Sequence, residues 1–130
     1  MKKKIINGLP YCITAALLLY CWVNILVTDN AATLKHYAAL ILMLANGIVY
    51  FKSYKWAVLF TGVVLLLATV NLLSFYVATQ TFWFGIAGVQ MPEIQYWSLL
   101  LFVVYAVINY NLLVDWYLDY KESRKADEER

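Results

Sequence analysis

The side chains that could support chemistry in this chain are few, and their spacing keeps them apart. His36 is the only histidine, so one chain cannot build a metal site from several imidazoles. Cys12 and Cys21 lie nine positions apart, which is about two and a half turns and places them on opposite sides of a helix. We therefore expect two free thiols that pack as small apolar groups, and a solvated His36 without a catalytic role.

Asp115 and Asp119 are the best candidates for acid/base chemistry, because a spacing of four residues places two carboxylates on one helix face. Paired carboxylates can act as a general acid and a general base. Both residues, however, follow the last apolar stretch, where Lys52 and Lys55 of a neighbouring loop come within reach. We therefore favour a salt-bridged anchor at the cytoplasmic boundary. We expect no catalytic residue, no cofactor and no metal ion, and hence a protein that is not an enzyme.

One asparagine interrupts each long apolar stretch, at Asn24, Asn46, Asn71 and Asn109. Antiparallel helices would place Asn24 and Asn71 at one depth and Asn46 and Asn109 at another, so we predict one interhelical polar pair at each depth. Such pairs fix the register of neighbouring helices. The alternative is a polar lining for a cavity or pore, although four amides at two depths line a continuous path poorly.

Segment 78–95 is the longest connection and contains Phe82-Trp83-Phe84. A loop exposed to water is polar, so three aromatic side chains indicate a position in the headgroup region or across the ends of the helices. Pro92 suits the start of the next helix. We expect either an interfacial plug or a surface that contacts a partner protein or lipid.

Composition predicts the elements that position these residues. Hydrophobic residues make up 64% of the chain and charged residues 14%, against about 45–50% and about 25% in soluble domains. The mean hydropathy is +0.67. A body of 130 residues has too little interior to bury so much apolar surface, so lipid is the predicted solvent. The net charge of +2 is too small to attract a nucleic acid.

Charged residues divide the chain into uncharged stretches at 5–28, 36–51, 56–92 and 94–114. About 20 residues of helix cross a bilayer, so we predict transmembrane helices at 6–27, 31–51, 55–77 and 94–120, and a charged cytoplasmic tail at 121–130. The second helix would begin near Ala31 with its N-cap in Thr28-Asp29-Asn30. The predicted class is all-α: a polytopic membrane protein whose four transmembrane helices form one antiparallel bundle over residues 1–130.

Lysine and arginine predict the orientation. Nine of the 10 basic residues fall on one side of the four-helix arrangement, and only Lys35 falls on the other. The positive-inside rule therefore places both termini in the cytoplasm. Tryptophan and tyrosine gather near the predicted helix ends, as they do at membrane surfaces. The first apolar stretch is too long for a cleaved signal peptide, so we expect it to stay as a membrane anchor. The short, loop-poor chain favours a multi-pass protein of the bacterial inner membrane.

The cores of the four predicted helices carry no Asp, Glu, Lys or Arg, although ion-coupled transporters usually keep an ionisable group there. We therefore expect a small, non-enzymatic membrane protein that associates with partner proteins or lipids in the bilayer, in an accessory, assembly or immunity-type role. Its partner would be a membrane protein or a second copy of the chain. The alternative is an oligomeric pore or transporter, because the chain resembles the holins in size, number of spans and charged tail.

Overall fold

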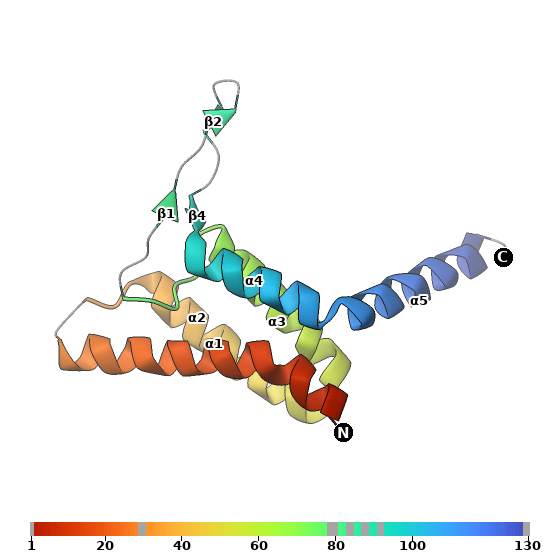
Figure 1. Cartoon of the computed structure of the whole chain (residues 1–130), viewed down its shortest axis with the longest axis horizontal. Coiled ribbons are helices and arrows are strands. Elements are labelled where there is room, and N and C mark those ends of the chain that lie inside the picture. The colour runs from red at the N-terminus through yellow and green to blue at the C-terminus, as the bar shows by residue number, and fades with distance from the viewer. Residues whose placement is uncertain are drawn as a thin grey trace.

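The computed structural model describes residues 2–28, 31–77, 81–82, 85–86, 89–90 and 93–128. The described residues form five helices and four short strands (Figure 1). The helices are α1 (Lys2–Val27), α2 (Leu34–Lys52), α3 (Tyr54–Thr69), α4 (Tyr96–Ile108) and α5 (Tyr110–Glu128). The strands are β1 (Thr81–Phe82), β2 (Gly85–Ile86), β3 (Val89–Gln90) and β4 (Ile94–Gln95). The all-α prediction is confirmed at this level, since the strands add only a small hairpin between α3 and α4.

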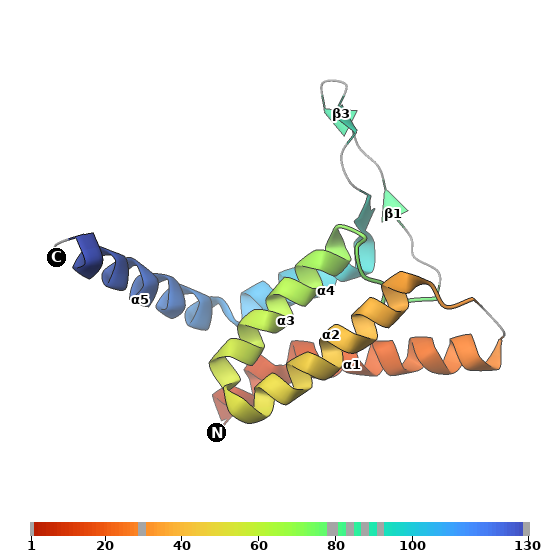
Figure 2. The same cartoon turned by 180° about the vertical axis from the view of Figure 1, so that it is seen from behind.

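The helices run back and forth between two ends of the molecule. The start of α1, the α2–α3 junction at Ser53 and the α4–α5 junction at Asn109 lie at one end, and the hairpin projects from the other (Figures 1 and 2). Lys52 and Lys55 flank Ser53, whereas Lys35 lies at the start of α2. We call the end that contains Ser53 the basic end, and the end from which the hairpin projects the hairpin end.

Two of the described helices are long and apolar enough to cross a membrane. These are α1, over Ile5–Val27 with a mean hydropathy of 1.8, and α2, with a mean hydropathy of 1.4. α4 and α5 would together make a third, but they meet at 70°. α3 is apolar but has only 16 residues, which span about 24 Å. The structure thus supports two or three membrane-spanning helices, and the predicted bundle of four is not confirmed.

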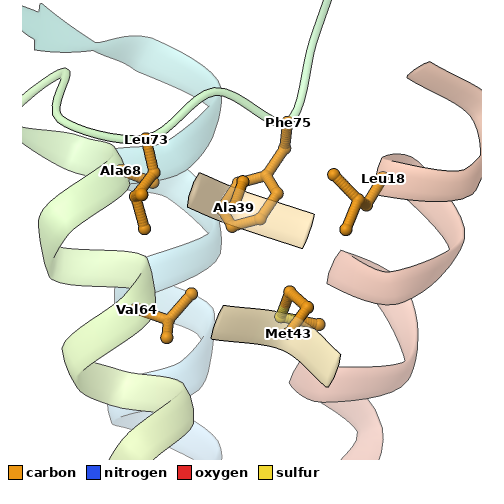
Figure 3. Close-up of a cluster of buried hydrophobic side chains, with 7 residues drawn as sticks. All are labelled: Leu18, Ala39, Met43, Val64, Ala68, Leu73 and Phe75. Carbon is orange, nitrogen blue, oxygen red and sulfur yellow. The ribbon is translucent and has the colours of Figure 1, made fainter. Parts of the chain in front are cut away.

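α3 is the central helix of the fold. It packs against α2 on one side and α4 on another, and small residues such as Ala57 and Gly62 are buried in these contacts. An apolar cluster joins α1, α2 and α3 to the segment that follows α3 (Figure 3). Its buried members are Leu18, Ala39, Met43, Val64, Ala68, Leu73 and Phe75.

Apolar side chains also cover much of the outside of α1, α2, α3 and α4. Leu26 of α1, Ile41 of α2 and Val107 of α4 are 74%, 65% and 73% exposed. Polar side chains are buried instead, among them Thr14, His36, Asn46, Thr61, Ser98 and Asn109. Exposing apolar surface to water is unfavourable by about 25 cal/mol per Å². An apolar exterior around buried polar groups is therefore the arrangement expected of a chain surrounded by lipid.

α2 begins at Leu34 and not near Ala31. Thr33 is its N-cap, and the Thr33 N–H donates to Nδ1 of His36 at 3.1 Å. His36 Nε2 lies 2.9 Å from the Tyr76 carbonyl oxygen, so the neutral ring donates its proton there. The prediction of a solvated His36 is wrong, because its side chain is buried and ties the start of α2 to the segment after α3. Positions 29–30 of the predicted cap lie outside the described residues.

α3 ends at Thr69 and not at the predicted position 77, because Asn71 adopts the left-handed conformation with a φ of 60°. The Asn71 N–H donates to the Ala68 carbonyl oxygen at 3.0 Å, and the Leu72 N–H donates to the Leu67 carbonyl oxygen at 2.9 Å. These two bonds form a Schellman motif, which uses glycine or asparagine at the left-handed position. The motif terminates the helix within an apolar stretch.

The predicted helix 94–120 is divided at Asn109 into α4 and α5. The backbone N–H and the side-chain Nδ2 of Asn109 both donate to the Tyr105 carbonyl oxygen, at 2.9 and 3.1 Å. A side chain that competes for a helix carbonyl bends the helix, and the bend here is 70°. α5 continues through most of the predicted tail and is exposed from Asp115 to Lys125.

We expect Gly62→Ala to lower the melting temperature of the detergent-solubilised protein. A Cβ at Gly62 would lie 2.6 Å from the Tyr105 hydroxyl oxygen and 2.7 Å from two of its ring carbons. Either the buried Tyr105 side chain or α4 itself would have to move, and overpacking of this kind costs about 1–3 kcal/mol. Thermal unfolding of the purified variant measures the effect.

Gly8→Ala is the matched control, because nothing lies within 4 Å of a Cβ at Gly8. Alanine is more stable than glycine within a helix by about 0.5–1 kcal/mol, so this variant should melt at or above the wild-type temperature. Equal melting of Gly62→Ala and wild type would contradict the close α3–α4 contact.

Candidate functional site

Asn46 makes an interhelical hydrogen bond of the predicted kind, but its partner is Thr61 and not Asn109. Asn46 Nδ2 donates to Thr61 Oγ1 at 2.8 Å, and both side chains are buried. On the other side of α3, the Tyr105 hydroxyl donates to the Val58 carbonyl oxygen at 2.9 Å. These contacts form a polar layer that joins α2, α3 and α4.

Asn24 and Asn109 direct their side-chain amides to carbonyl oxygens of their own helices. Asn24 donates to Tyr20 at 2.9 Å, and Asn109 donates to Tyr105 at 3.1 Å. The hydrogen bonds of the described residues include neither of the predicted asparagine–asparagine pairs. Asn109 is fully buried, so its effect is to bend a helix within the packed interior.

Asn71 organises the hairpin end. Its Nδ2 donates to Glu93 Oε2 at 2.7 Å, and its Oδ1 accepts a hydrogen bond from Gln95 Nε2 at 2.8 Å. The buried Gln95 also donates to the Leu73 carbonyl oxygen and accepts from the Ser98 hydroxyl, both at 2.9 Å. These bonds tie the end of α3 to the base of the hairpin and to the first turn of α4.

Tyr76 lies beside this network. Its carbonyl oxygen accepts hydrogen bonds from His36 and from the Ser74 hydroxyl, both at 2.9 Å. Burial raises the pKa of the Tyr76 phenol to about 12, so the phenol keeps its proton at physiological pH.

The segment that carries Phe82-Trp83-Phe84 contains an antiparallel hairpin, in which β1 pairs with β4 and β2 with β3. The described strands project from the hairpin end and do not lie across it as the expected plug would (Figure 1). The centroid of the Phe82 ring lies 4.5 Å from that of Tyr96. Trp83 and Phe84 lie outside the described residues. A contact surface for a partner or lipid at these three residues stays a prediction.

A pocket at the basic end gathers polar residues from three parts of the chain. Its volume is about 360 Å³. Its walls come from the beginnings of α1 and α3 and from the α4–α5 junction. The lining residues are Ile6, Asn7, Lys55, Ile108, Asn111, Leu112, Asp115, Trp116 and Asp119. The predicted carboxylate pair therefore lines a cavity, and we call this cavity the basic-end pocket.

α5 presents a polar stripe to the basic-end pocket, because Asn111, Asp115 and Asp119 follow one another at four-residue intervals. Lys55, in the first turn of α3, supplies the positive charge of the lining. No ion pair joins Lys55 to either carboxylate in the described part of the chain. Lys52 forms no ion pair with them among the described residues either, so the structure shows no salt bridge there, and the role of Asp115 and Asp119 as a cytoplasmic anchor stays a prediction.

The arrangement suits a ligand that carries both charges. Side chains four residues apart on a helix have Cβ atoms about 5–6 Å apart, so Asp115 and Asp119 can accept hydrogen bonds from one cation. Lys55 can donate to an anionic group. Apolar side chains complete the wall. The described residues contain no cluster of three or more His, Cys, Asp or Glu side chains that could hold a metal ion.

Sequence reasoning identified Asp115, Asp119 and Lys55 but missed Asn7 and Asn111. The four-residue spacing on one helix is a signal that could have added Asn111. No spacing along one helix could have identified Asn7, because the α5 residues that share its pocket lie about 100 positions later in the chain.

Comparison with protein families, with characterised proteins and with solved structures finds no match to this chain. The fold and the pocket define a small helical protein with two or three helices able to cross a membrane. The pocket, the exposed apolar surface and the distribution of charge are the features of this structure that bear on its function.

Asn46→Ala and Thr61→Val should each destabilise the protein, and their effects should be coupled. Each variant removes the α2–α3 hydrogen bond, and such bonds in membrane proteins contribute about 0.6–1.7 kcal/mol. Unfolding of the two single variants and the double variant in detergent measures the coupling energy. Asn24→Ala is the control, because the Asn24 side chain bonds to its own helix. Its effect on the free energy of unfolding should add to that of Thr61→Val without coupling. Additivity of Asn46→Ala with Thr61→Val would contradict the interhelical bond.

Proposed function

We propose that this chain is a small multi-pass membrane protein that acts by association and binds lipid at its basic end. The basic-end pocket is the observation that carries the proposal, because charged groups that form no ion pair with one another among the described residues adjoin an apolar wall there. Its described lining includes no His, Cys, Ser or Thr, so it offers neither a Ser–His nor a Cys–His pair. Binding, and not catalysis, is the role that this set of side chains favours.

The membrane assignment is supported by the apolar outer surface of the helices. In this proposal α1, α2, α3 and α4 cross the bilayer in alternating directions, as the arrangement of their ends suggests (Figures 1 and 2). α3 and α4 are shorter than a typical span, which local thinning of the bilayer and flanking lysines can accommodate.

The proposed orientation places both termini and the basic end in the cytoplasm. The distribution of lysine and arginine supports it through the positive-inside rule. α5 fits a place along the membrane surface at this end, because a helix bent 70° from a membrane-crossing segment lies close to the membrane plane. Trp116, Tyr117 and Tyr120 of α5 are exposed, and such side chains favour the membrane–water interface.

An oligomeric pore, transporter or holin-like protein is the second candidate. Asn46 and Asn109 each keep a buried side-chain oxygen without a hydrogen-bond partner, and water in a polar path would satisfy such atoms. Both side chains, however, are 0% exposed within a single chain, so neither lies on a face that a second copy could line. Association is therefore the better-supported function.

Cysteine labelling tests the orientation. In a chain whose Cys12 and Cys21 are replaced by serine, Lys2→Cys and Ser123→Cys should react with a membrane-impermeant maleimide from the cytoplasmic side only. Thr81→Cys should react from the opposite side only. Labelling of Lys2→Cys and Ser123→Cys on different faces would overturn the even number of crossings.

Lipid binding is tested by the phospholipid that stays with the protein through detergent purification, quantified by mass spectrometry. We expect Leu112→Trp to reduce this phospholipid several-fold, because Leu112 lines the basic-end pocket and a larger side chain would fill it. Leu118→Trp is the control, since Leu118 is exposed on α5 outside the lining. Equal retention by the two variants would contradict binding in the pocket. Dye release from liposomes that contain the protein would favour the pore.

A further inference from the structure

We infer that the basic-end pocket selects a zwitterionic headgroup whose cation carries N–H donors, which is the phosphoethanolamine headgroup of a membrane phospholipid. This inference rests on the proposed function, because it names the class of lipid that the pocket takes. The inference follows from the signs of the lining charges, the four-residue spacing of the two carboxylates on α5 and the apolar wall beside them.

The carboxylates of Asp115 and Asp119 would bind the cationic group of the headgroup. They lie on one face of α5, and no ion pair with a basic side chain of the described chain neutralises them. A primary ammonium has three N–H donors and can donate to both carboxylates at once. Hydrogen bonds between charged groups are about twice as strong as neutral ones. A trimethylammonium group has the same charge but no N–H, so it cannot form them.

Lys55 would bind the anionic phosphate of the headgroup. Its ammonium group belongs to the first turn of α3, where the helix dipole adds to the positive potential. A phosphate beside Lys55 and an ammonium beside the carboxylates would complement every charge of the lining. An anionic headgroup without a cation would face the two carboxylates of Asp115 and Asp119. Repulsion between these like charges would disfavour the binding of such a lipid.

The apolar wall indicates that the headgroup belongs to a lipid. Ile6, Leu112 and Trp116 line the same cavity as the charged groups. Tryptophan favours the depth at which headgroups meet acyl chains. A glycerol backbone and the first methylene groups of a phospholipid would bury this wall, whereas free phosphoethanolamine would leave it uncovered.

A series of phospholipids with identical acyl chains tests the selection. The headgroups are phosphoethanolamine and its mono-, di- and trimethylated forms, so that N–H donors fall from three to none while the charge stays constant. Titrations of the detergent-solubilised full-length protein are followed by native mass spectrometry. We expect the affinity to fall stepwise, by about a hundredfold in total, because the trimethylated headgroup loses its hydrogen bonds to both carboxylates and each such bond is worth about tenfold.

Variants assign the effect to residues. The double variant Asp115→Asn, Asp119→Asn should bind all four lipids alike, and Lys55→Gln should weaken binding of the whole series. Glu122→Gln is the matched control, because it removes a carboxylate of α5 that does not line the pocket, and it should keep the wild-type preference. Circular dichroism confirms that each variant is folded.

The outcomes distinguish this inference from the function on which it rests. Equal affinity across the methylated series, or a preference that survives in the double variant, would overturn the inference. Retention of phospholipid that Leu112→Trp blocks, without any headgroup preference, would overturn it and leave the proposed function standing. If free phosphoethanolamine binds as tightly as the phospholipid, the claim that the headgroup belongs to a lipid would be overturned.

Discussion

Most polar side chains buried among α2, α3 and α4 find their partners within the chain, because the outer surface of these helices is apolar. An unpaired polar group in hydrocarbon costs several kcal/mol. Thr61 meets this requirement within its own helix by donating to the Ala57 carbonyl oxygen, and it accepts a hydrogen bond from Asn46. Tyr105 reaches the backbone of α3. Pairing of this kind determines how α2, α3 and α4 pack against each other.

Three asparagines illustrate how context decides what one side chain does. Asn46 faces another helix and joins two helices. Asn71 adopts a left-handed backbone conformation and ends α3. Asn109 competes for a carbonyl oxygen of its own helix and bends the chain. An amide is an equally good donor and acceptor in all three cases, so its neighbours in space select the outcome. Sequence reasoning located all three but assigned only Asn46 to its kind of contact.

The basic-end pocket depends on the bend at Asn109. Because α5 leaves α4 at 70°, its polar stripe faces the beginnings of α1 and α3, where Lys55 lies. A continuous helix at 94–120 would have carried Asp115 and Asp119 onward along the axis of α4. The spacing of the two carboxylates was readable from the sequence, but their role as walls of a cavity was not. The hairpin was missed for another reason, since strands of two residues have no periodicity to detect.

The sequence by itself determined the helical class, the apolar exterior, the position of α1 and the uneven distribution of charge. These properties follow from composition and from the local spacing of side chains, which hold whatever the helices later contact. Only the tertiary structure decided where α3 ends, where α4 bends, which groups pair with the asparagines, and that α1, α3 and α5 share a pocket. Each of these depends on hydrogen bonds or packing between specific atoms, many of them from distant parts of the chain, and the pattern along a single helix does not contain them.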